Sequence, residues 1–319
     1  MVRKGEVVRS IVLGGAGFIG SHLVDRLLAR GDEVVAVDNL LTGRRDSAER
    51  HRGQPRFTFL DHDVCEPIPL QGAAATVFNL ASPASPLDYA RLPLETLDVG
   101  SRGTRNALEL ARRTDATLVH ASTSEVYGDP LEHPQREDYF GNVNPVGPRA
   151  CYDEAKRFAE ALITSYARVH GLPVRLARIF NTYGPRMRSD DGRVVPAFVS
   201  QALRGEDFTV FGDGTQTRSF CYVDDLVAGL LALLERGDAR PVNLGNPHEM
   251  TLIELAETTR RVVGKGGRIR SVRPLPENDP KQRRPDITRA RTLLGWEPKI
   301  GLEEGLKPTV AWFRRELGL

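Results

Sequence analysis

The chain has 319 residues, with 44 lysines and arginines against 42 aspartates and glutamates. A chain of this length can bury a large core, either as one compact unit or as two closely joined lobes. The nearly balanced charge argues against a nucleic-acid partner, and we find no apolar stretch long enough to cross a membrane. The three cysteines, Cys65, Cys151 and Cys221, have no metal-ligand spacing. We therefore expect no metal site and a reducing, cytoplasmic location.

Short apolar segments alternate with helical patterns through the first 180 residues. We expect strands at residues 7–13, 33–37, 57–60, 76–80, 117–121 and 174–179, and helices at residues 18–30, 94–113 and 150–170. Strands that alternate with helices are typical of a parallel sheet with helices on both faces. The pattern predicts an α/β fold built on a doubly wound, Rossmann-type parallel sheet.

Beyond residue 180 the alternation is less regular. Helices are expected at residues 196–204, 224–236, 251–263 and 303–316, and strands at residues 208–211 and 219–223. We interpret residues 1–180 as a dinucleotide-binding domain that includes the helix at 150–170. Residues 181–319 are interpreted as a smaller C-terminal substrate-binding lobe, with some elements that return to the sheet.

A glycine-rich run from Gly14 to Gly20 (GGAGFIG) follows the first expected strand and precedes the first expected helix. It fits both G-x-x-G-x-x-G and G-x-G-x-x-G, spacings that let the backbone approach a pyrophosphate at a helix N-terminus. Asp38 closes the second expected strand, where a carboxylate can bind the adenosine ribose and repel a 2′-phosphate. These features predict NAD as the cofactor, with NADP as an alternative because of Arg44 and Arg45.

Tyr152 and Lys156 are four residues apart within the helix expected at 150–170. Residues at this spacing share one face of a helix, so the ammonium group is expected to lower the pKa of the phenol. Thr123, just after the strand expected at 117–121, can hold a substrate alcohol against that phenol. A tyrosine base beside a nicotinamide that accepts a hydride predicts an enzyme that oxidises an alcohol.

Longer strings extend this pattern. Residues 80–86 (LASPASP), 122–130 (STSEVYGDP), 151–156 (CYDEAK), 178–187 (RIFNTYGPRM) and 282–287 (QRRPDI) resemble the UDP-glucuronate decarboxylases, also called UDP-xylose synthases, of the extended short-chain dehydrogenase/reductase superfamily. The resemblance covers nearly the whole chain. It implies a tightly held NAD, UDP-glucuronate as the substrate, and a homodimer, in which we expect the helices at 94–113 and 150–170 to pair with their copies.

The resemblance also implies a course for the reaction. Tyr152 removes the C4 hydroxyl proton while NAD takes the C4 hydride, and Thr123 orients the hydroxyl. The 4-keto acid loses CO2, the enolate is protonated at C5, and the hydride returns to C4. Glu125 and an arginine of the 282–287 string are the candidates for handling the C5 proton and the sugar ring. A structural hydrogen bond is the alternative role for Glu125.

Ser124 separates the possible reactions of this superfamily. Related sugar 4,6-dehydratases have an Asp-Glu pair after the active-site threonine, and the aspartic acid protonates the departing water. This chain has Ser124-Glu125 at the corresponding place. Serine is too weak an acid to serve a leaving hydroxide, so the pair favours decarboxylation.

The expected site has three groups of residues. The catalytic residues are Tyr152, Lys156, Thr123, Glu125 and Ser124. The cofactor-binding residues are Gly14, Gly17, Phe18, Ile19, Gly20, Asp38, Asn39, Thr42, Gly43, Leu80, Ser82, Tyr152 and Lys156, with Asp63 and Val64, which could instead form a solvated turn. The substrate-binding residues are Ser85, Thr123, Asn181, Arg193, Arg218, Tyr222 and Arg283, with Arg284 as an alternative to Arg283.

One position departs from the family's pattern. Asp98 stands where members commonly carry a lysine near the substrate, and an aspartate there is expected to repel the uronate carboxylate. The departure keeps two other readings open. One is a nucleotide-sugar 4-epimerase or 4,6-dehydratase of the same fold. The other is a non-catalytic NAD-sensing module, although such a module could dispense with the Tyr-Lys pair.

Overall fold

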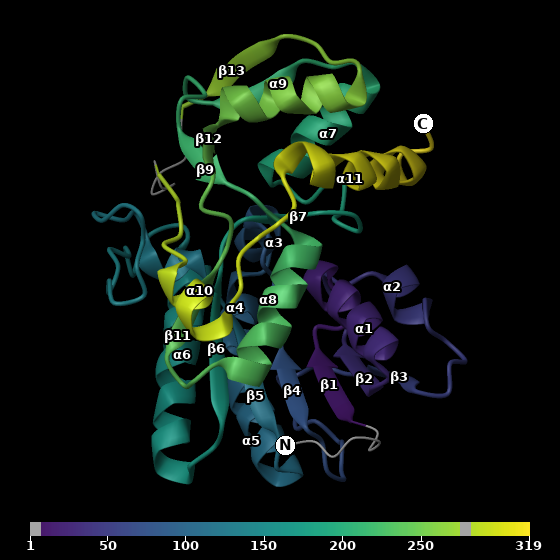
Figure 1. The fold of residues 1–319 in the computed structure, drawn as a ribbon, viewed down its shortest axis with the longest axis vertical. Helices are drawn as coiled ribbons and strands as arrows, with labels where there is room; N and C mark the ends of the chain where they lie inside the picture. The colour runs from purple at the N-terminus through teal and green to yellow at the C-terminus, as the bar shows by residue number, and fades with distance from the viewer. Residues whose placement is uncertain (1–7, 275–281) are drawn as a thin grey trace.

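The computed structural model describes residues 8–274 and 282–319. A parallel sheet of seven strands lies at its centre, in the order β11-β6-β5-β4-β1-β2-β3 (Figure 1). The predicted α/β fold with a doubly wound parallel sheet is confirmed. Val7, the first residue of the first expected strand, lies outside the described residues. The strands of this sheet are β1 (Arg9–Leu13), β2 (Glu33–Asp38), β3 (Phe57–Asp61), β4 (Thr76–Asn79), β5 (Thr117–Thr123), β6 (Val174–Ile179) and β11 (Pro241–Leu244).

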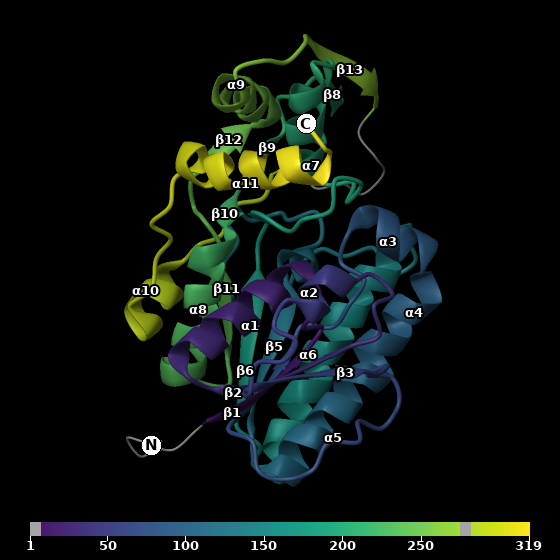
Figure 2. The ribbon, with the colours of Figure 1, turned by 90° about the vertical axis from the view of Figure 1, so that its right-hand side faces the viewer.

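Both faces of the sheet are covered by helices because its strands are apolar on both sides. Val12 of β1 packs into the apolar cluster that includes α1 (Phe18–Arg30) and α8 (Val223–Arg236). The neighbouring Ile11 belongs to the cluster on the other face, which includes α5 (Thr104–Thr114) and α6 (Ala150–His170). Figure 2 shows α1 and α8 on one side of the strands, and α5 and α6 on the other.

The helix predicted at residues 94–113 is present without a break, but its geometry is not uniform. The structure has α4 (Pro93–Asp98), then a π-helical turn, η1 (Val99–Gly103), and then α5. The π-helical turn lies where the segment packs tightly against α6. A Cβ atom at Gly100 would come within 2.5 Å of the Cβ atom of Ala155. Close packing against a neighbouring helix therefore accompanies the change of helical geometry.

A short helix, α3 (Pro86–Arg91), follows β4 and is absent from the predicted elements. Ser85 caps its N-terminus, because its hydroxyl oxygen accepts a hydrogen bond of 3.1 Å from the N–H of Asp88. Proline at the first helical position suits this start. The carboxylate of Asp88 also forms an ion pair of 2.7 Å with Arg188. These contacts fix α3 against the segment that follows β7 (Thr182–Tyr183).

Helices α7 (Val194–Arg204), α9 (Leu252–Val263) and α11 (Leu302–Glu316) form a layer above the C-terminal ends of the sheet's strands, which we call the C-terminal layer (Figure 1). The predicted strand at residues 219–223 is interrupted, since β9 ends at Ser219 and β10 begins at Cys221. Strand β11, which was not predicted, returns to the sheet and pairs with β6.

No helix among the described residues has the length and apolar character needed to cross a bilayer. The remaining elements are α2 (Arg45–Glu49), η2 (Ser124–Tyr127), β8 (Phe208–Phe211), β9 (Thr217–Ser219), β10 (Cys221–Tyr222), β12 (Glu249–Thr251), β13 (Ile269–Arg273) and α10 (Thr288–Leu294).

Candidate active site

A cleft of about 800 Å³ lies between the C-terminal ends of the central strands and the C-terminal layer. Residues at the ends of β1, β4, β5 and β6 line it, together with residues of α6 and α7. The strand order reverses at β1, because β2 and β3 lie on one side of it and β4, β5 and β6 on the other. Open α/β sheets bind their ligands at such a switch point.

The glycine loop between β1 and α1 forms one wall of this cleft. Gly14 has a φ of +80°, and a Cβ atom there would lie 2.7 Å from the backbone nitrogen of Ala81. A Cβ atom at Gly20 would overlap the carbonyl oxygen of Gly14. No described side chain caps the N-terminus of α1, whose N-cap is Gly17. The N–H groups of residues 14–17 donate hydrogen bonds within the protein, so the bare loop gives close approach and the first turn of α1 offers the N–H groups that fit the pyrophosphate of a dinucleotide.

Asp38 lies beneath this loop at the end of β2. Its carboxylate accepts hydrogen bonds from the N–H groups of Ala16 (3.0 Å) and Leu40 (2.9 Å). Burial raises the pKa of Asp38 above its ordinary value, and the charge of Asp61 adds to the effect. A Cβ atom at Gly43 would lie 2.6 Å from one of the Asp38 oxygens. Asp38 therefore holds the glycine loop and the following turn together at the rim of the cleft.

The expected cofactor-binding residues divide between the cleft and its surroundings. Val64 is buried in the apolar cluster beside α5, and the amide of Asn39 donates a hydrogen bond of 3.3 Å to Asp63. The expected residues that line the cleft are Gly14, Gly17, Phe18, Ile19, Gly20, Thr42, Leu80, Ser82, Tyr152 and Lys156. Those outside its described lining are Asp38, Asn39, Gly43, Asp63 and Val64.

Arg44, one of the residues that left NADP as an alternative, is occupied by protein groups. Its guanidinium forms ion pairs with Asp46 (2.9 Å) and with Glu316 of α11 (2.6 Å). It also lies 5.5 Å from the centre of the Trp312 ring. A guanidinium engaged by two carboxylates and an aromatic face is poorly placed to bind a 2′-phosphate. The geometry favours NAD.

Tyr152 and Lys156 lie on the face of α6 that points toward the end of β5. The ammonium group of Lys156 donates a hydrogen bond of 2.8 Å to the carbonyl oxygen of Ala121 and lies 5.8 Å from the centre of the Tyr152 ring. Burial lowers the pKa of Lys156 to about 8. Burial also raises the pKa of Tyr152, against the opposing effects of the Thr123 hydroxyl and of Arg193. We expected Lys156 to lower the pKa of Tyr152. In the protein alone this pKa is not lowered, because the loss of water around the phenol has the larger effect.

Thr123 and Ser124 lie where β5 turns into the short helix η2. The hydroxyl oxygen of Thr123 accepts a hydrogen bond of 3.2 Å from the N–H of Glu125, and both Thr123 and Ser124 line the cleft. Ser124 is buried. The hydroxyl-bearing pair therefore faces the same space as the phenol of Tyr152.

Glu125 is held between two guanidinium groups, those of Arg149 and Arg283. We call these three residues the carboxylate clamp. Burial lowers the pKa of Arg283 to about 10, which still leaves it protonated at neutral pH. Two cations beside a carboxylate favour its ionised form. Of the two arginines in the 282–287 string, Arg283 lies in the cleft, whereas Arg284 is outside its described lining.

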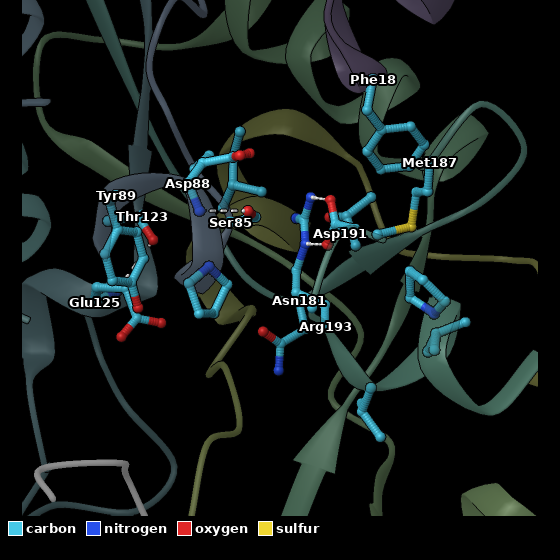
Figure 3. Close-up of a pocket in the computed structure, with 18 of the residues that line it drawn as sticks. Phe18, Ser85, Asp88, Tyr89, Thr123, Glu125, Asn181, Met187, Asp191 and Arg193 are labelled. Atoms are coloured by element: carbon cyan, nitrogen blue, oxygen red, sulfur yellow. Dashed lines mark hydrogen bonds and ion pairs between the residues drawn. The ribbon is translucent and has the colours of Figure 1, made fainter. Parts of the chain in front are cut away.

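Most of the expected substrate-binding residues also line the cleft: Ser85, Thr123, Asn181, Arg193, Arg218 and Arg283. Arg193 is paired with Asp191, with 2.7 Å between one nitrogen and one oxygen, and Figure 3 shows this pair beside Asn181. Tyr222 was expected in the nucleotide pocket, but it lies outside the described lining. Its ring packs in the core, 5.6 Å from the ring of Tyr183.

Asp98 does not lie in the cleft. Its side chain is 53% exposed at the end of α4 and lies 4.0 Å from the guanidinium of Arg102, and it is outside the described lining of the cleft. The expected repulsion between Asp98 and a uronate therefore does not arise in this structure, because the side chain faces the surface.

Tyr89 and Arg149 are among the cleft residues that the sequence patterns missed. The ring of Tyr89 stacks on that of Tyr152, with 5.1 Å between the ring centres and 13° between the planes. Figure 3 shows Tyr89 close to Thr123 and Glu125. A serine followed by proline is a helix-start signal. Applied to Ser85 and Pro86, it would have placed Tyr89 on a helix beside the cleft.

Comparison with known proteins relates this arrangement to established enzymes. The chain is 54% identical to UDP-glucuronic acid decarboxylase 4 of Arabidopsis thaliana over 314 residues, which are 98% of this chain and 70% of that protein. It is 52% identical to UDP-glucuronic acid decarboxylase 1 of Xenopus tropicalis over 309 residues, which are 97% of this chain and 73% of that protein. The resemblance found in the sequence strings is confirmed.

Solved structures share the fold over nearly the full chain. UDP-glucose 4-epimerase of Thermotoga maritima, solved with UDP-glucose, has a TM-score of 0.88 at 32% identity, covering 97% of this chain and 100% of that one. A dTDP-glucose 4,6-dehydratase of Streptomyces venezuelae, solved with NAD, has a TM-score of 0.87 at 27% identity, covering 98% of both chains. A family model described as the NAD dependent epimerase/dehydratase family matches residues 10–245. NAD is thereby confirmed as the cofactor, and the chain belongs to the NAD dependent epimerase/dehydratase family.

Proposed function

We propose that the chain converts UDP-glucuronate to UDP-xylose and CO2, with no net oxidation. The observation that carries this proposal is Ser124, which lines the cleft beside Thr123 and Glu125. A serine there provides no acid for a leaving hydroxide, whereas loss of CO2 from a 4-keto uronate needs none. Relatives named UDP-glucuronic acid decarboxylase, at 52–54% identity, support the same reaction.

Each catalytic residue has a role in this reaction. Tyr152 removes the proton of the C4 hydroxyl, which Thr123 holds in place. Lys156, with a pKa of about 8, is mostly protonated at neutral pH and supplies positive charge near the phenol. Bound NAD supplies a reversible acceptor for the C4 hydride.

The loss of CO2 follows from the C4 ketone. The bond between C5 and the carboxylate breaks, and its electron pair enters the enolate that the ketone stabilises. A proton then forms the new C–H bond at C5, so each turnover consumes one proton from solvent. Because the clamp favours the ionised form of Glu125, we assign this residue to accepting hydrogen bonds from the sugar ring, and not to donating the C5 proton.

Cationic side chains line the cleft and can bind the charged groups of the substrate. We propose that Arg218 and Arg283 bind the diphosphate, and that Asn181, Arg193 and Ser85 contact the nucleotide and the sugar, since all of them line the cleft. A planar guanidinium suits phosphate oxygens. In this proposal, residues 1–180 hold NAD and the catalytic helix, and residues 181–319 mainly bind the nucleotide sugar.

We further propose a homodimer formed by α4 and α6. Leu94 of α4 is 72% exposed and Phe158 of α6 is 49% exposed. Large apolar side chains on two neighbouring helices are costly in water, and a second copy of the chain would cover them. Pairing of two helices from each subunit gives a four-helix contact.

A cytoplasmic location is proposed from the cysteines. Cys65, Cys151 and Cys221 are all free. Free thiols are typical of proteins that work in a reducing compartment.

The proposal is tested by incubating the purified protein with UDP-glucuronate and following the nucleotide sugar by mass spectrometry. We expect the mass to fall by that of CO2, and the product to co-migrate with UDP-xylose. The Tyr152→Phe variant, which lacks the base, is the control for non-enzymatic loss.

Other outcomes would assign other functions. A 4-epimerase would give an isomer of unchanged mass, and a dehydratase acting on another nucleotide sugar would remove water. Bound NAD without turnover of any nucleotide sugar would indicate the NAD-sensing module. Each of these results would reject decarboxylation.

A further inference from the structure

Tyr89 reaches the cleft from α3, an element with no assigned function. The residue is buried, and α3 is fixed by the Ser85 cap and by the ion pair between Asp88 and Arg188. The thiol of Cys151 lies 3.6 Å from the carbonyl oxygen of Tyr89 and donates to it. Since Cys151 directly precedes the catalytic tyrosine, α3 is tied to the start of α6.

The ring of Tyr89 links two parts of the site. It stacks on Tyr152 in the nearly parallel arrangement that aromatic rings favour when they are offset. The guanidinium carbon of Arg149 lies 5.8 Å from the centre of the Tyr89 ring, within the range of a cation–π contact. Arg149 is also a member of the carboxylate clamp. Tyr89 is thus in contact with both the base and the clamp.

The position of the Tyr152 phenol matters because burial opposes its ionisation. The groups that favour the phenolate are Thr123, through a hydrogen bond, and Arg193 and Arg149, through their charges. A shift of the hydroxyl would weaken these interactions and would also lengthen the path of the proton. A misplacement of about 1 Å can slow a reaction by roughly 100-fold.

We infer that Tyr89 is a positioning residue, whose ring holds the phenol of Tyr152 in the orientation for proton removal and keeps Arg149 beside it. The inference rests on the proposed function, because it concerns the base of that reaction. It assigns the positioning of the phenol to the flat ring of Tyr89, which is the part of the side chain that stacks on Tyr152.

The test compares variants that keep or remove the flat ring. Tyr89→Phe keeps it, whereas Tyr89→Leu and Tyr89→Met fill similar space without it. Arg91→Ala is a matched control on the same helix, because its side chain is 67% exposed and lies 3.5 Å from the carboxylate of Asp88. For each variant, kcat, KM and NAD content are measured with UDP-glucuronate.

We expect Tyr89→Phe and Arg91→Ala to stay within about twofold of the parent. Tyr89→Leu and Tyr89→Met should lose roughly 10- to 100-fold in kcat, with KM and NAD content little changed. Parental kcat in both aliphatic variants would overturn the inference. An equal loss in Tyr89→Phe would also overturn it, because the hydroxyl would then be responsible. A rise in KM at constant kcat would make Tyr89 a substrate contact instead.

A second measurement needs no substrate, so it separates this inference from the proposed function. Crystals of the NAD-loaded Tyr89→Leu variant should show the Tyr152 ring in more than one orientation. A single, parental orientation would overturn the inference even if the parent did not decarboxylate UDP-glucuronate.

Discussion

Replacing Lys156 by methionine should stabilise the NAD-free fold while abolishing activity. The pKa of Lys156 falls from its ordinary value of 10.5 to about 8 because the ammonium is buried. At about 1.4 kcal/mol per pKa unit, protonated Lys156 costs the fold about 3.5 kcal/mol near neutral pH. Lys156→Met also removes the hydrogen bond from Lys156 to the carbonyl oxygen of Ala121. This loss reduces the gain in stability by about 1.5 kcal/mol. A net gain of about 2 kcal/mol in the free energy of unfolding is expected for Lys156→Met near pH 7.

The dependence of the free energy of unfolding on pH gives a second, independent test of the buried ammonium. Unfolded chains keep lysine protonated up to its ordinary pKa, whereas the folded chain releases the proton from about pH 8. The folded parent therefore binds fewer protons between these values, and its stability rises with pH. Between about pH 7 and about pH 9.5 the parent should gain roughly 2 kcal/mol relative to Lys156→Met.

The assay is urea unfolding of NAD-free protein, followed by tryptophan fluorescence near these two pH values. Lys307→Met, at an exposed position of α11, is the matched control and should follow the parent at both values. The reasoning is refuted if Lys156→Met is less stable than the parent near neutral pH. It is also refuted if the two proteins show the same change with pH.

Three further predictions concern the cofactor, the base and the subunit contact. Gly20→Ala places a Cβ atom against the loop backbone, so NAD retained through purification should fall at least tenfold when measured after denaturing extraction. Gly301→Ala, where nothing lies within 4 Å of the new Cβ atom, should retain NAD fully. Tyr152→Phe should lower kcat by about 100-fold or more without loss of NAD, whereas unchanged turnover would contradict a role as base. Phe158→Asp places a charge on the exposed apolar face of α6, and sedimentation should show a monomer; a dimer of parental stability would place the contact elsewhere.

The parallel sheet and the chemistry at its edge could be predicted because their signals are local. The glycine run between Gly14 and Gly20 needs only its own spacing and the strand before it to be interpreted. The placement of Tyr152 and Lys156 on one face could be predicted from the period of a helix alone. Thr123 follows from the end of a strand, and its neighbour Ser124 lies in the cleft with it.

Features that depend on tertiary packing could not be predicted in this way. Strand β11 has four residues and becomes a strand because the edge of β6 accepts it. Tyr222 carries a polar hydroxyl, yet its ring is covered by Tyr183 and by the backbone at Gly305. The exposure of Asp98, at the residue before a π-helical turn, is not shown by a periodic pattern of residues. The partners of Glu125 come from Arg149 and Arg283, distant segments that only the folded chain brings together.

The ion pair between Arg44 and Glu316 has a consequence for how the protein is made. The two residues are 272 positions apart in the chain. At a synthesis rate of roughly 5–20 residues per second, α11 leaves the ribosome on the order of 14 to 54 seconds after the loop that carries Arg44. The first strands and the glycine loop can therefore fold early, but this rim of the cleft is completed only after α11 has been synthesised.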